Sequence, residues 1–213
     1  MNRLRRYGFD LRSIANYGEQ YGDDFLENLR RSVISACDSN SHEAHYDSTE
    51  KRVFGFEKVC SEGSEFLDLS ASILREYGID RPKDTLLAIK NEPIAYGRDE
   101  HHKGRWHIDS FRSQFKVFLF LSDVSADAGP LAVVPKSHYA SFKAKSVVTG
   151  KYYNPFSKDD PRLYRRLSDQ QYDDLAIPLI VPKGTIAIVN TSCVHRATPC
   201  VSKTRVALTS YFV

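Results

Sequence analysis

Long apolar runs, cysteines and an excess of one charge are all scarce in this chain of 213 residues. No stretch approaches the roughly 18 consecutive apolar residues that a membrane-spanning helix needs. The basic start, MNRLRRYGFD, has no apolar run behind it, so we expect no secretory signal. A net charge of +3 is too small to indicate nucleic-acid binding. We therefore expect neither a membrane nor a nucleic acid as partner.

The few cysteines indicate a reducing compartment. Cys37, Cys60, Cys193 and Cys200 are irregularly spaced, and in a chain without an export signal they are most simply free thiols. We therefore expect a cytoplasmic protein. A composition of 41% hydrophobic and 27% charged residues is typical of a globular protein, and the length fits one domain spanning 1–213.

The pattern along the chain predicts a mainly β fold with flanking α-helices. Residues 24–37 and 65–77 have helical spacing and 52–59 alternates like a strand, which gives a mostly helical part over about 1–80. Short β-rich runs follow, at residues 85–91, 105–109, 115–122, 131–135, 179–182, 185–190 and 205–213. Because helices do not alternate with these runs, we expect an antiparallel jelly roll, a double-stranded β-helix of the cupin-like kind, over about 85–213. An insertion at about 140–177 interrupts it, with a helix expected after Pro161.

Two short segments about ninety residues apart indicate a metal site. His107 and Asp109 are two residues apart in a predicted strand, so their side chains point to the same face. Three ligands on one short strand cannot converge, and His195, just beyond the apolar run TIAIVN, is well placed to be the third. Two imidazoles and one carboxylate form the facial triad of non-haem Fe(II) oxygenases.

Other metal-binding patterns in the sequence are weaker. His42 and His45 lie in the polar stretch SNSHEAHYD, where a solvated loop explains them better than zinc. Cys193, His195 and Cys200 superficially resemble a zinc cluster. Sharing His195 with His107 and Asp109 is more economical, and a set without thiolate argues against structural zinc.

The second half of the chain resembles a known family. From Trp106 to Val213 it carries the HxD, then strand, Asp, Gly-Pro, strand and Pro-x-Ser-His, then a distal His-Arg and an Arg ten residues past the distal His. Together these features are similar to the phytanoyl-CoA dioxygenase family of Fe(II)/2-oxoglutarate oxygenases. The N-terminal half carries no motif that we can place.

The resemblance implies roles for individual residues. His107, Asp109 and His195 would ligate Fe(II), and Arg205 would bind the far carboxylate of 2-oxoglutarate, with O₂ as the other co-substrate. A guanidinium suits that role because it can form two parallel charge-assisted hydrogen bonds and keeps its charge. Ala207 stands where many relatives place a Ser or Thr that also touches the co-substrate. Thr209, on the same strand face, and Lys116 are our candidates to contribute there, and Thr85, Lys90 and Gln114 are others.

The turn Pro135-Lys136-Ser137-His138 departs from the family pattern, because Lys136 replaces the usual glycine. We expect His138 to be a hydrogen-bonded residue that shapes this loop rather than a metal ligand. The intact Asp109 predicts hydroxylation, desaturation or cyclisation rather than halogenation, since relatives that halogenate leave that ligand position open to halide.

The substrate is less legible. Tyr96, His101 and Arg105 precede the metal segment and could form a rim that meets a polar or anionic substrate. A short chain with a modest insertion favours a small polar metabolite over a macromolecule. Two other functions stay open on the sequence. One is a cupin-like isomerase or hydrolase, which would have no need of Arg205 as a 2-oxoglutarate anchor. The other is a non-catalytic binding protein with a vestigial site.

Overall fold

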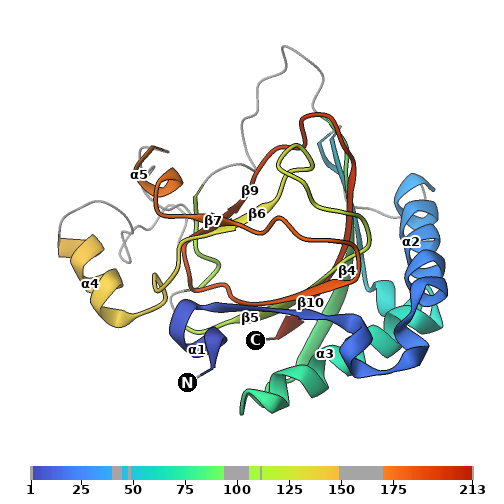
Figure 1. Ribbon diagram of the computed structural model, residues 1–213, viewed down its shortest axis with the longest axis horizontal. Coiled ribbons are helices and arrows are strands. Elements are labelled where there is room, and N and C mark those ends of the chain that lie inside the picture. The colour runs from blue at the N-terminus through green and yellow to red at the C-terminus, as the bar shows by residue number, and fades with distance from the viewer. Residues whose placement is uncertain are drawn as a thin grey trace.

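The computed structural model describes residues 2–39, 45–47, 49–93, 106–110, 112–148 and 170–212. Helices gather on two opposite sides of a β core (Figure 1). The helices are α1 (Arg3–Tyr7), α2 (Asp23–Asp38), α3 (Ser61–Glu76), α4 (Ala140–Val148) and α5 (Gln170–Asp173), with short 3-10 turns η1 (Ile14–Tyr17), η2 (Glu19–Tyr21) and η3 (Phe56–Lys58). The fold is mainly β with flanking helices, as the sequence predicts.

Two antiparallel sheets form the core of the jelly roll. The larger sheet has the order β1-β8-β5-β10-β4-β3-β2 and the smaller one has the order β7-β6-β9. The strands are β1 (Phe9–Ser13), β2 (His45–Asp47), β3 (Glu50–Phe54), β4 (Lys83–Asn91), β5 (Phe115–Phe120), β6 (Leu131–Val133), β7 (Ile177–Pro178), β8 (Thr185–Asn190), β9 (His195–Ala197) and β10 (Arg205–Phe212). Neighbours in the sheets come from distant parts of the chain, which is how residues ninety positions apart can meet.

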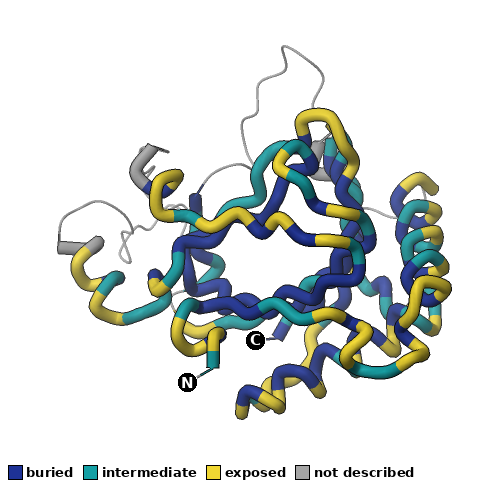
Figure 2. Tube along the Cα trace, in the orientation of Figure 1, coloured by how far each residue is buried: buried dark blue, intermediate teal, exposed yellow. Residues whose placement is uncertain are grey.

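The two faces of the larger sheet have different partners. One face packs against α2 and α3, whose apolar residues recur at helical spacing and are buried with Val206, Leu208 and Phe212 of β10. Ala207 points the other way, into a second cluster that also holds Leu131 and Val133 of the smaller sheet. Successive side chains of a strand alternate between faces, so Arg205 and Thr209 also face the smaller sheet. Buried segments of both sheets line this interior in Figure 2.

A third, smaller cluster lies beside the smaller sheet, near α4 and α5. It joins Trp106 and Ile108 of the metal segment to Val194, next to His195, and to Tyr172 of α5. Arg196 lies over the Trp106 ring, with 4.5 Å from Cζ to the ring centroid, and its Nη2 is 2.7 Å from Asp173 Oδ1. The C-terminal end of the predicted insertion, at α5, therefore contacts both segments that carry predicted metal ligands.

Several predicted boundaries were wrong. The predicted strand 105–109 is not seen over its described part, 106–109, where His107 makes only an isolated bridge to His195. The predicted strand 179–182 is replaced by β7 and a bridge from Val181 to Val124. The predicted strand 52–59 ends at Phe54 and continues as η3. The N-terminal part also contributes β1, which pairs with β8 at the edge of the larger sheet. The helix expected after Pro161 lies outside the described residues.

Candidate metal centre

The two segments that carry the predicted ligands are bound to each other through their backbones. The His107 N–H donates to the His195 carbonyl at 3.0 Å, and the His195 N–H donates to the His107 carbonyl at 2.8 Å. The Asp109 N–H donates to the Thr191 carbonyl at 2.9 Å. Backbone bonds thus fix all three side chains relative to one another, although 106–110 is not a regular strand.

The side chains of His107, Asp109 and His195 converge as the HxD spacing predicts. One ligand atom from each lies within 4.8 Å of the other two. His107 Nε2 is 3.6 Å from Asp109 Oδ1, and His195 Nε2 is 3.7 Å from Asp109 Oδ2. His195 is buried, whereas the His107 side chain is 37% exposed. The group has one protected side and one side open to a small molecule, and two nitrogens with one carboxylate fit a divalent redox metal.

Electrostatics keep Asp109 and His195 in the protonation states that metal binding requires. Burial alone would raise the pKa of the Asp109 carboxyl, but His195, His107 and Lys116 beside it hold that pKa well below its usual range. Burial, reinforced by nearby His107, lowers the pKa of His195 to about 4. At neutral pH the carboxylate is therefore ionised and the His195 ring is neutral.

The free nitrogen of His195 is set by its other hydrogen bond. Its Nδ1 lies 2.9 Å from the carbonyl oxygen of Cys193, which can only accept, so Nδ1 carries the proton and Nε2 keeps its lone pair. The Cys193 thiol faces away from this group, 3.4 Å from His138 Nδ1. His138 Nε2 in turn lies 3.2 Å from the Arg5 carbonyl oxygen. The expectation that His138 shapes the loop by hydrogen bonding is confirmed.

Lys116 and Arg205 occupy different places in the interior. Lys116 Nζ is 2.7 Å from Asp109 Oδ2, so this ammonium lies at the metal centre itself. Arg205 begins β10 and is buried. Its Nη2 donates to Asn91 Oδ1 at 2.9 Å, and its Nη1 has no hydrogen-bond partner among the described residues. The buried Thr209 Oγ1, on the same face of β10, also has no partner there. A buried donor without a partner is costly, so these groups fit a site for a polar ligand.

The remaining candidates divide into three groups. The Lys90 ammonium contacts Asp38 of α2 on the helix side of the sheet, so the suggestion that it could reach the site is wrong. Thr85 Oγ1 accepts from the Gly55 N–H, and the Gln114 carbonyl oxygen accepts from the Thr191 N–H. Tyr96, His101 and Arg105, the predicted substrate-binding residues, lie outside the described residues. Asn91 was missed, because a polar residue in a predicted strand does not stand out as a site residue. Ser137 lies in the Pro-x-Ser-His turn, but the sequence assigned it no role.

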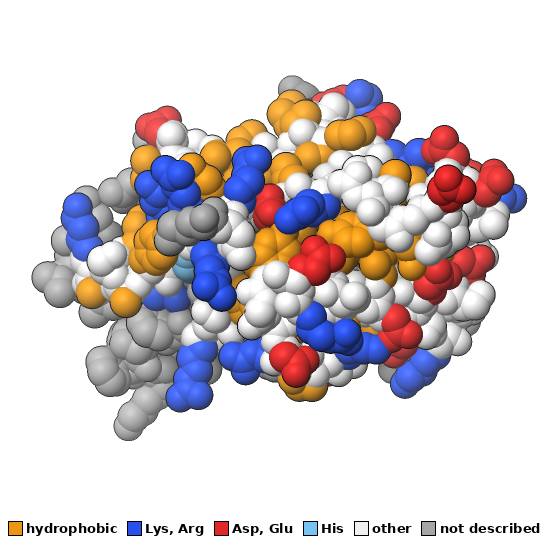
Figure 3. Space-filling view, turned by 60° about the horizontal axis from the view of Figure 1, so that its bottom comes forward, with side chains coloured by type: hydrophobic (Ala, Val, Ile, Leu, Met, Phe, Trp, Pro, Cys, Tyr) orange, Lys and Arg blue, Asp and Glu red, His pale blue; other side chains and the backbone are white. Residues whose placement is uncertain are grey.

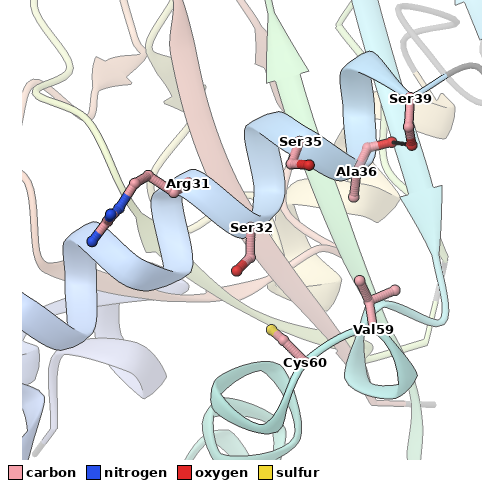
Figure 4. Close-up of a pocket in the computed structure, with 7 residues that line it drawn as sticks. All are labelled: Arg31, Ser32, Ser35, Ala36, Ser39, Val59 and Cys60. Carbon is pink, nitrogen blue, oxygen red and sulfur yellow. Dashed lines mark hydrogen bonds between the residues drawn. The ribbon is translucent and has the colours of Figure 1, made fainter.

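A groove on the other side of the larger sheet is separate from the metal centre. It has a volume of about 440 Å³ and lies between α2 and the start of α3, lined by Arg31, Ser32, Ser35, Ala36, Ser39, Val59 and Cys60 (Figure 4). None of the predicted site residues lines it. Its cysteine is not activated, because burial raises the pKa of the Cys60 thiol.

Solved structures similar to this chain include two with metal and 2-oxoglutarate bound. An epimerase, SnoN, in complex with Fe3+, alpha ketoglutarate and nogalamycin RO has a TM-score of 0.71 at 13% identity over 99% of this chain and 80% of that one. The alpha ketoglutarate-dependent carbocyclase SnoK has a TM-score of 0.65 at 15% identity over 99% and 81%. HygX from Streptomyces hygroscopicus, with nickel and 2-oxoglutarate bound, has a TM-score of 0.63 at 12% identity over 98% and 83%. At these identities the likeness establishes the jelly-roll fold.

The sequence itself establishes the family. No curated protein matches the chain in a sequence search. The profile of the family described as Phytanoyl-CoA dioxygenase (PhyH) does match, over residues 26–207, which is well over half of the chain and includes His107, Asp109, His195 and Arg205. This match also covers most of α2 and all of α3, where the sequence shows no motif that we can place. The chain therefore belongs to the phytanoyl-CoA dioxygenase family of non-haem iron, 2-oxoglutarate-dependent oxygenases.

Proposed function

We propose that His107, Asp109 and His195 hold Fe(II) on one face, and that the enzyme oxidises a C–H bond of a small, polar metabolite. The observation that carries this proposal is the convergence of the three side chains in the same interior as the buried Arg205 Nη1, which has no partner in the part of the chain that the structure describes. A cupin-like isomerase or hydrolase would gain nothing from a buried guanidinium without a carboxylate partner. A vestigial binding protein has no reason to keep all three ligands and this donor together.

Arg205 is proposed to bind the far carboxylate of 2-oxoglutarate through Nη1. The Thr209 hydroxyl is proposed to donate a hydrogen bond to the same carboxylate. It would replace the Ser or Thr that many relatives have at the position of Ala207. Lys116, at the metal centre, is proposed to attract the other end of the co-substrate. With Fe(II) bound to two neutral imidazoles and one carboxylate, Lys116 makes the centre electropositive. That charge suits a dianion such as 2-oxoglutarate.

The bound iron and co-substrate supply the oxidising power: O₂ and 2-oxoglutarate yield succinate and CO₂ while the substrate C–H bond is oxidised. The chain's own residues bind, orient and exclude water. The apolar cluster that includes Phe120, Val189 and Ala207 fills part of the interior between the two sheets, and its apolar side chains offer no hydrogen bonds to water. The carbonyl of Cys193 keeps the Nδ1 proton of His195 away from the metal side.

The substrate is proposed to be a small molecule, because the similar structures were solved with nogalamycin RO and with hygromycin B. Tyr96, His101 and Arg105 remain our candidates for contacts to it, and the insertion at 140–177 is proposed to contribute as well. Because two of the similar structures are an epimerase and a carbocyclase, the proposed reaction outcomes extend beyond hydroxylation. All four cysteines are free, which suits the proposed cytoplasmic location. Among the described residues, no helix has the length and apolar character to cross a membrane.

We also propose that residues 1–213 work as one oxygenase domain. The helices α2 and α3 cover one face of the larger sheet, and Arg205 and Thr209 project from its other face. Removing the helical part would expose the apolar side chains of the strands that carry the site.

Anaerobic addition of Fe(II) and 2-oxoglutarate to the purified apoprotein tests the proposal. A weak visible charge-transfer band is expected, and it should be absent in His107→Ala and Asp109→Ala. Arg205→Ala should need at least about tenfold more 2-oxoglutarate while binding iron as the unchanged chain does, because one charge-assisted pair is lost. Arg205→Lys keeps the charge but not the forked geometry of the guanidinium. It should need a 2-oxoglutarate concentration between those of the unchanged chain and of Arg205→Ala. No band at saturating co-substrate would contradict the iron and 2-oxoglutarate assignment.

A further inference from the structure

One row of side chains crosses three strands of the larger sheet at the level of Arg205. Arg205 of β10 is the register partner of Asn91 of β4, and Asn91 is the register partner of Glu50 of β3. All three residues are buried, with relative exposures of 7%, 9% and 3%. They face the interior, opposite the helices. Buried polar residues on adjacent strands at one level need a physical reason, because an apolar row would cost less.

Hydrogen bonds fix the direction of each group in this row. Asn91 Nδ2 donates to Glu50 Oε2 at 2.8 Å, and Asn91 Oδ1 accepts from Arg205 Nη2 at 2.9 Å. A carboxylate can only accept and a guanidinium can only donate, so the amide has one possible orientation between them. With Nη2 held by Asn91, the planar guanidinium cannot rotate freely. Its Nη1 therefore keeps one direction.

The charges of the row leave Arg205 available to an anion. Glu50 also pairs with Arg52 through Oε1, so its negative charge is shared with another guanidinium. The group that touches Arg205 is a neutral amide. An aspartate or glutamate at position 91 would form an ion pair with Arg205, and the arginine would then need no anion from outside the protein. Asn91 instead transmits the orientation set by Glu50, and among the described residues no carboxylate contacts the Arg205 guanidinium.

We propose that Asn91 and Glu50 are positioning residues that aim Arg205 at the far carboxylate of the 2-oxo acid. Through this aim they would set the preference of the enzyme for a dicarboxylic over a monocarboxylic 2-oxo acid. The proposal rests on the proposed function, since it assumes that Arg205 binds the co-substrate. It goes beyond that function because neither residue belongs to the motifs that carry the family resemblance, and both act on the ligand only through Arg205.

The test compares two co-substrates of equal carbon number in the iron-loaded protein under anaerobic conditions. 2-Oxoglutarate carries the far carboxylate and 2-oxopentanoate lacks it, and the visible band reports the binding of each. Asn91→Asp should weaken 2-oxoglutarate binding at least about tenfold, because the new carboxylate competes for Arg205. Binding of 2-oxopentanoate and of Fe(II) should change less than about twofold. Glu50→Gln, which frees the amide of Asn91 to flip, should lower the preference for 2-oxoglutarate about threefold or more.

Ser210→Ala is the matched control. Ser210 is buried in β10 and its hydroxyl donates to Ser70 Oγ at 3.0 Å on the helix side of the sheet, so its loss perturbs the same strand without reaching the row. It should leave the preference unchanged. If Asn91→Asp fails to fold, Glu50→Gln decides the question.

The outcomes separate the two proposals. An unchanged protein that binds both acids equally well would overturn the assignment of Arg205 and the proposed function with it. A protein that prefers 2-oxoglutarate, with variants that keep the preference within twofold, would overturn only the roles of Asn91 and Glu50. Equal loss of both acids in the variants would also overturn those roles, since it would indicate a merely structural effect.

Discussion

Ser137 links the turn after β6 to the segment that carries His195. Its buried hydroxyl donates to the Val134 carbonyl at 2.7 Å and accepts from the Val194 N–H at 2.7 Å. The Val134 N–H donates to the Val194 carbonyl at 2.9 Å. The Ser137 side chain thus satisfies backbone groups of Val134 and of Val194. Val194 directly precedes the proposed metal ligand His195. Its role is to hold the His195 backbone in place.

Ser137→Ala should therefore lower both stability and metal affinity. The change leaves the buried Val194 N–H without its partner, which costs about 1–3 kcal/mol of unfolding free energy. Loosening of the backbone beside His195 should also weaken metal binding about 10-fold. Urea denaturation and a Ni(II) titration measure the two effects. Ser202→Ala, which removes an exposed hydroxyl near Asp127, should change neither; equal metal affinity in Ser137→Ala would contradict this role.

The residues predicted from the sequence are those whose chemistry shows in a short pattern. Spacing in the sequence was enough to select His107, Asp109, His195 and Arg205. The i and i+2 positions of the HxD place two side chains on one side, and the family motif places the distal His and Arg. Asn91 and Glu50 show no such signal, because a polar residue on a strand reads the same whether it is buried or exposed. Lys136 illustrates the opposite case. Its substitution for glycine is visible in the sequence, and the structure keeps the left-handed turn, with a φ of 66° at the lysine.

At the scale of elements, β1 is attached to the helical layer as well as to β8. The Tyr77 hydroxyl, just after α3, donates to Asp10 Oδ2 at 2.7 Å and accepts from Arg12 Nε at 3.1 Å. Asp10 is buried. Burial and the contact with Asp10 raise the pKa of Tyr77 to about 12, so the phenol stays protonated and keeps donating across the physiological range.

Tyr77→Phe should destabilise the fold without affecting the metal centre. It removes a donor from a buried carboxylate, and we expect a loss of about 1–3 kcal/mol in the free energy of unfolding. Chemical denaturation checks the loss, and the 2-oxoglutarate affinity should stay within about twofold of the unchanged chain. Tyr139→Phe, whose hydroxyl donates to exposed backbone carbonyls of α1, provides a milder comparison. A stability unchanged by Tyr77→Phe would show that the Tyr77 hydroxyl does not help to hold β1 in place.

The elements predicted best are long and periodic. The helix expected at 24–37 is α2, and the strand expected at 185–190 is β8. The predicted strand around Trp106 was wrong because its apolar residues are explained by packing rather than by strand pairing. Trp106 and Ile108 fill the third cluster, and His107 makes a single bridge. The strand β1 was missed because its partner β8 lies more than 170 residues away. Local pattern carries no information about such a pairing.

At the scale of the whole molecule, the two sheets divide the work. The larger sheet separates the helix-facing core from the interior that holds Arg205, and the smaller sheet brings His195 to that interior.

On the outer surface, both signs of charge share the face shown in Figure 3, with hydrophobic side chains exposed between them. The metal centre joins the side chains of the segment at 106–110 to that of His195 in β9. Binding of a metal should therefore stabilise the assembled fold rather than a local segment.

Metal and co-substrate together should raise the thermal midpoint of the apoprotein. A ligand that binds only the folded chain adds about 2.7 kcal/mol at a hundred times its dissociation constant, which for a chain of this size corresponds to about 5–10 °C. Ni(II), which does not turn over, with 2-oxoglutarate is the probe for a thermal scan. His195→Ala should lose the shift, because the two segments no longer share the ion. His138→Ala should lower the midpoint of the apoprotein yet keep the shift, since His138 bonds to Arg5 and not to metal. A shift that survives in His195→Ala would place the metal elsewhere in the molecule.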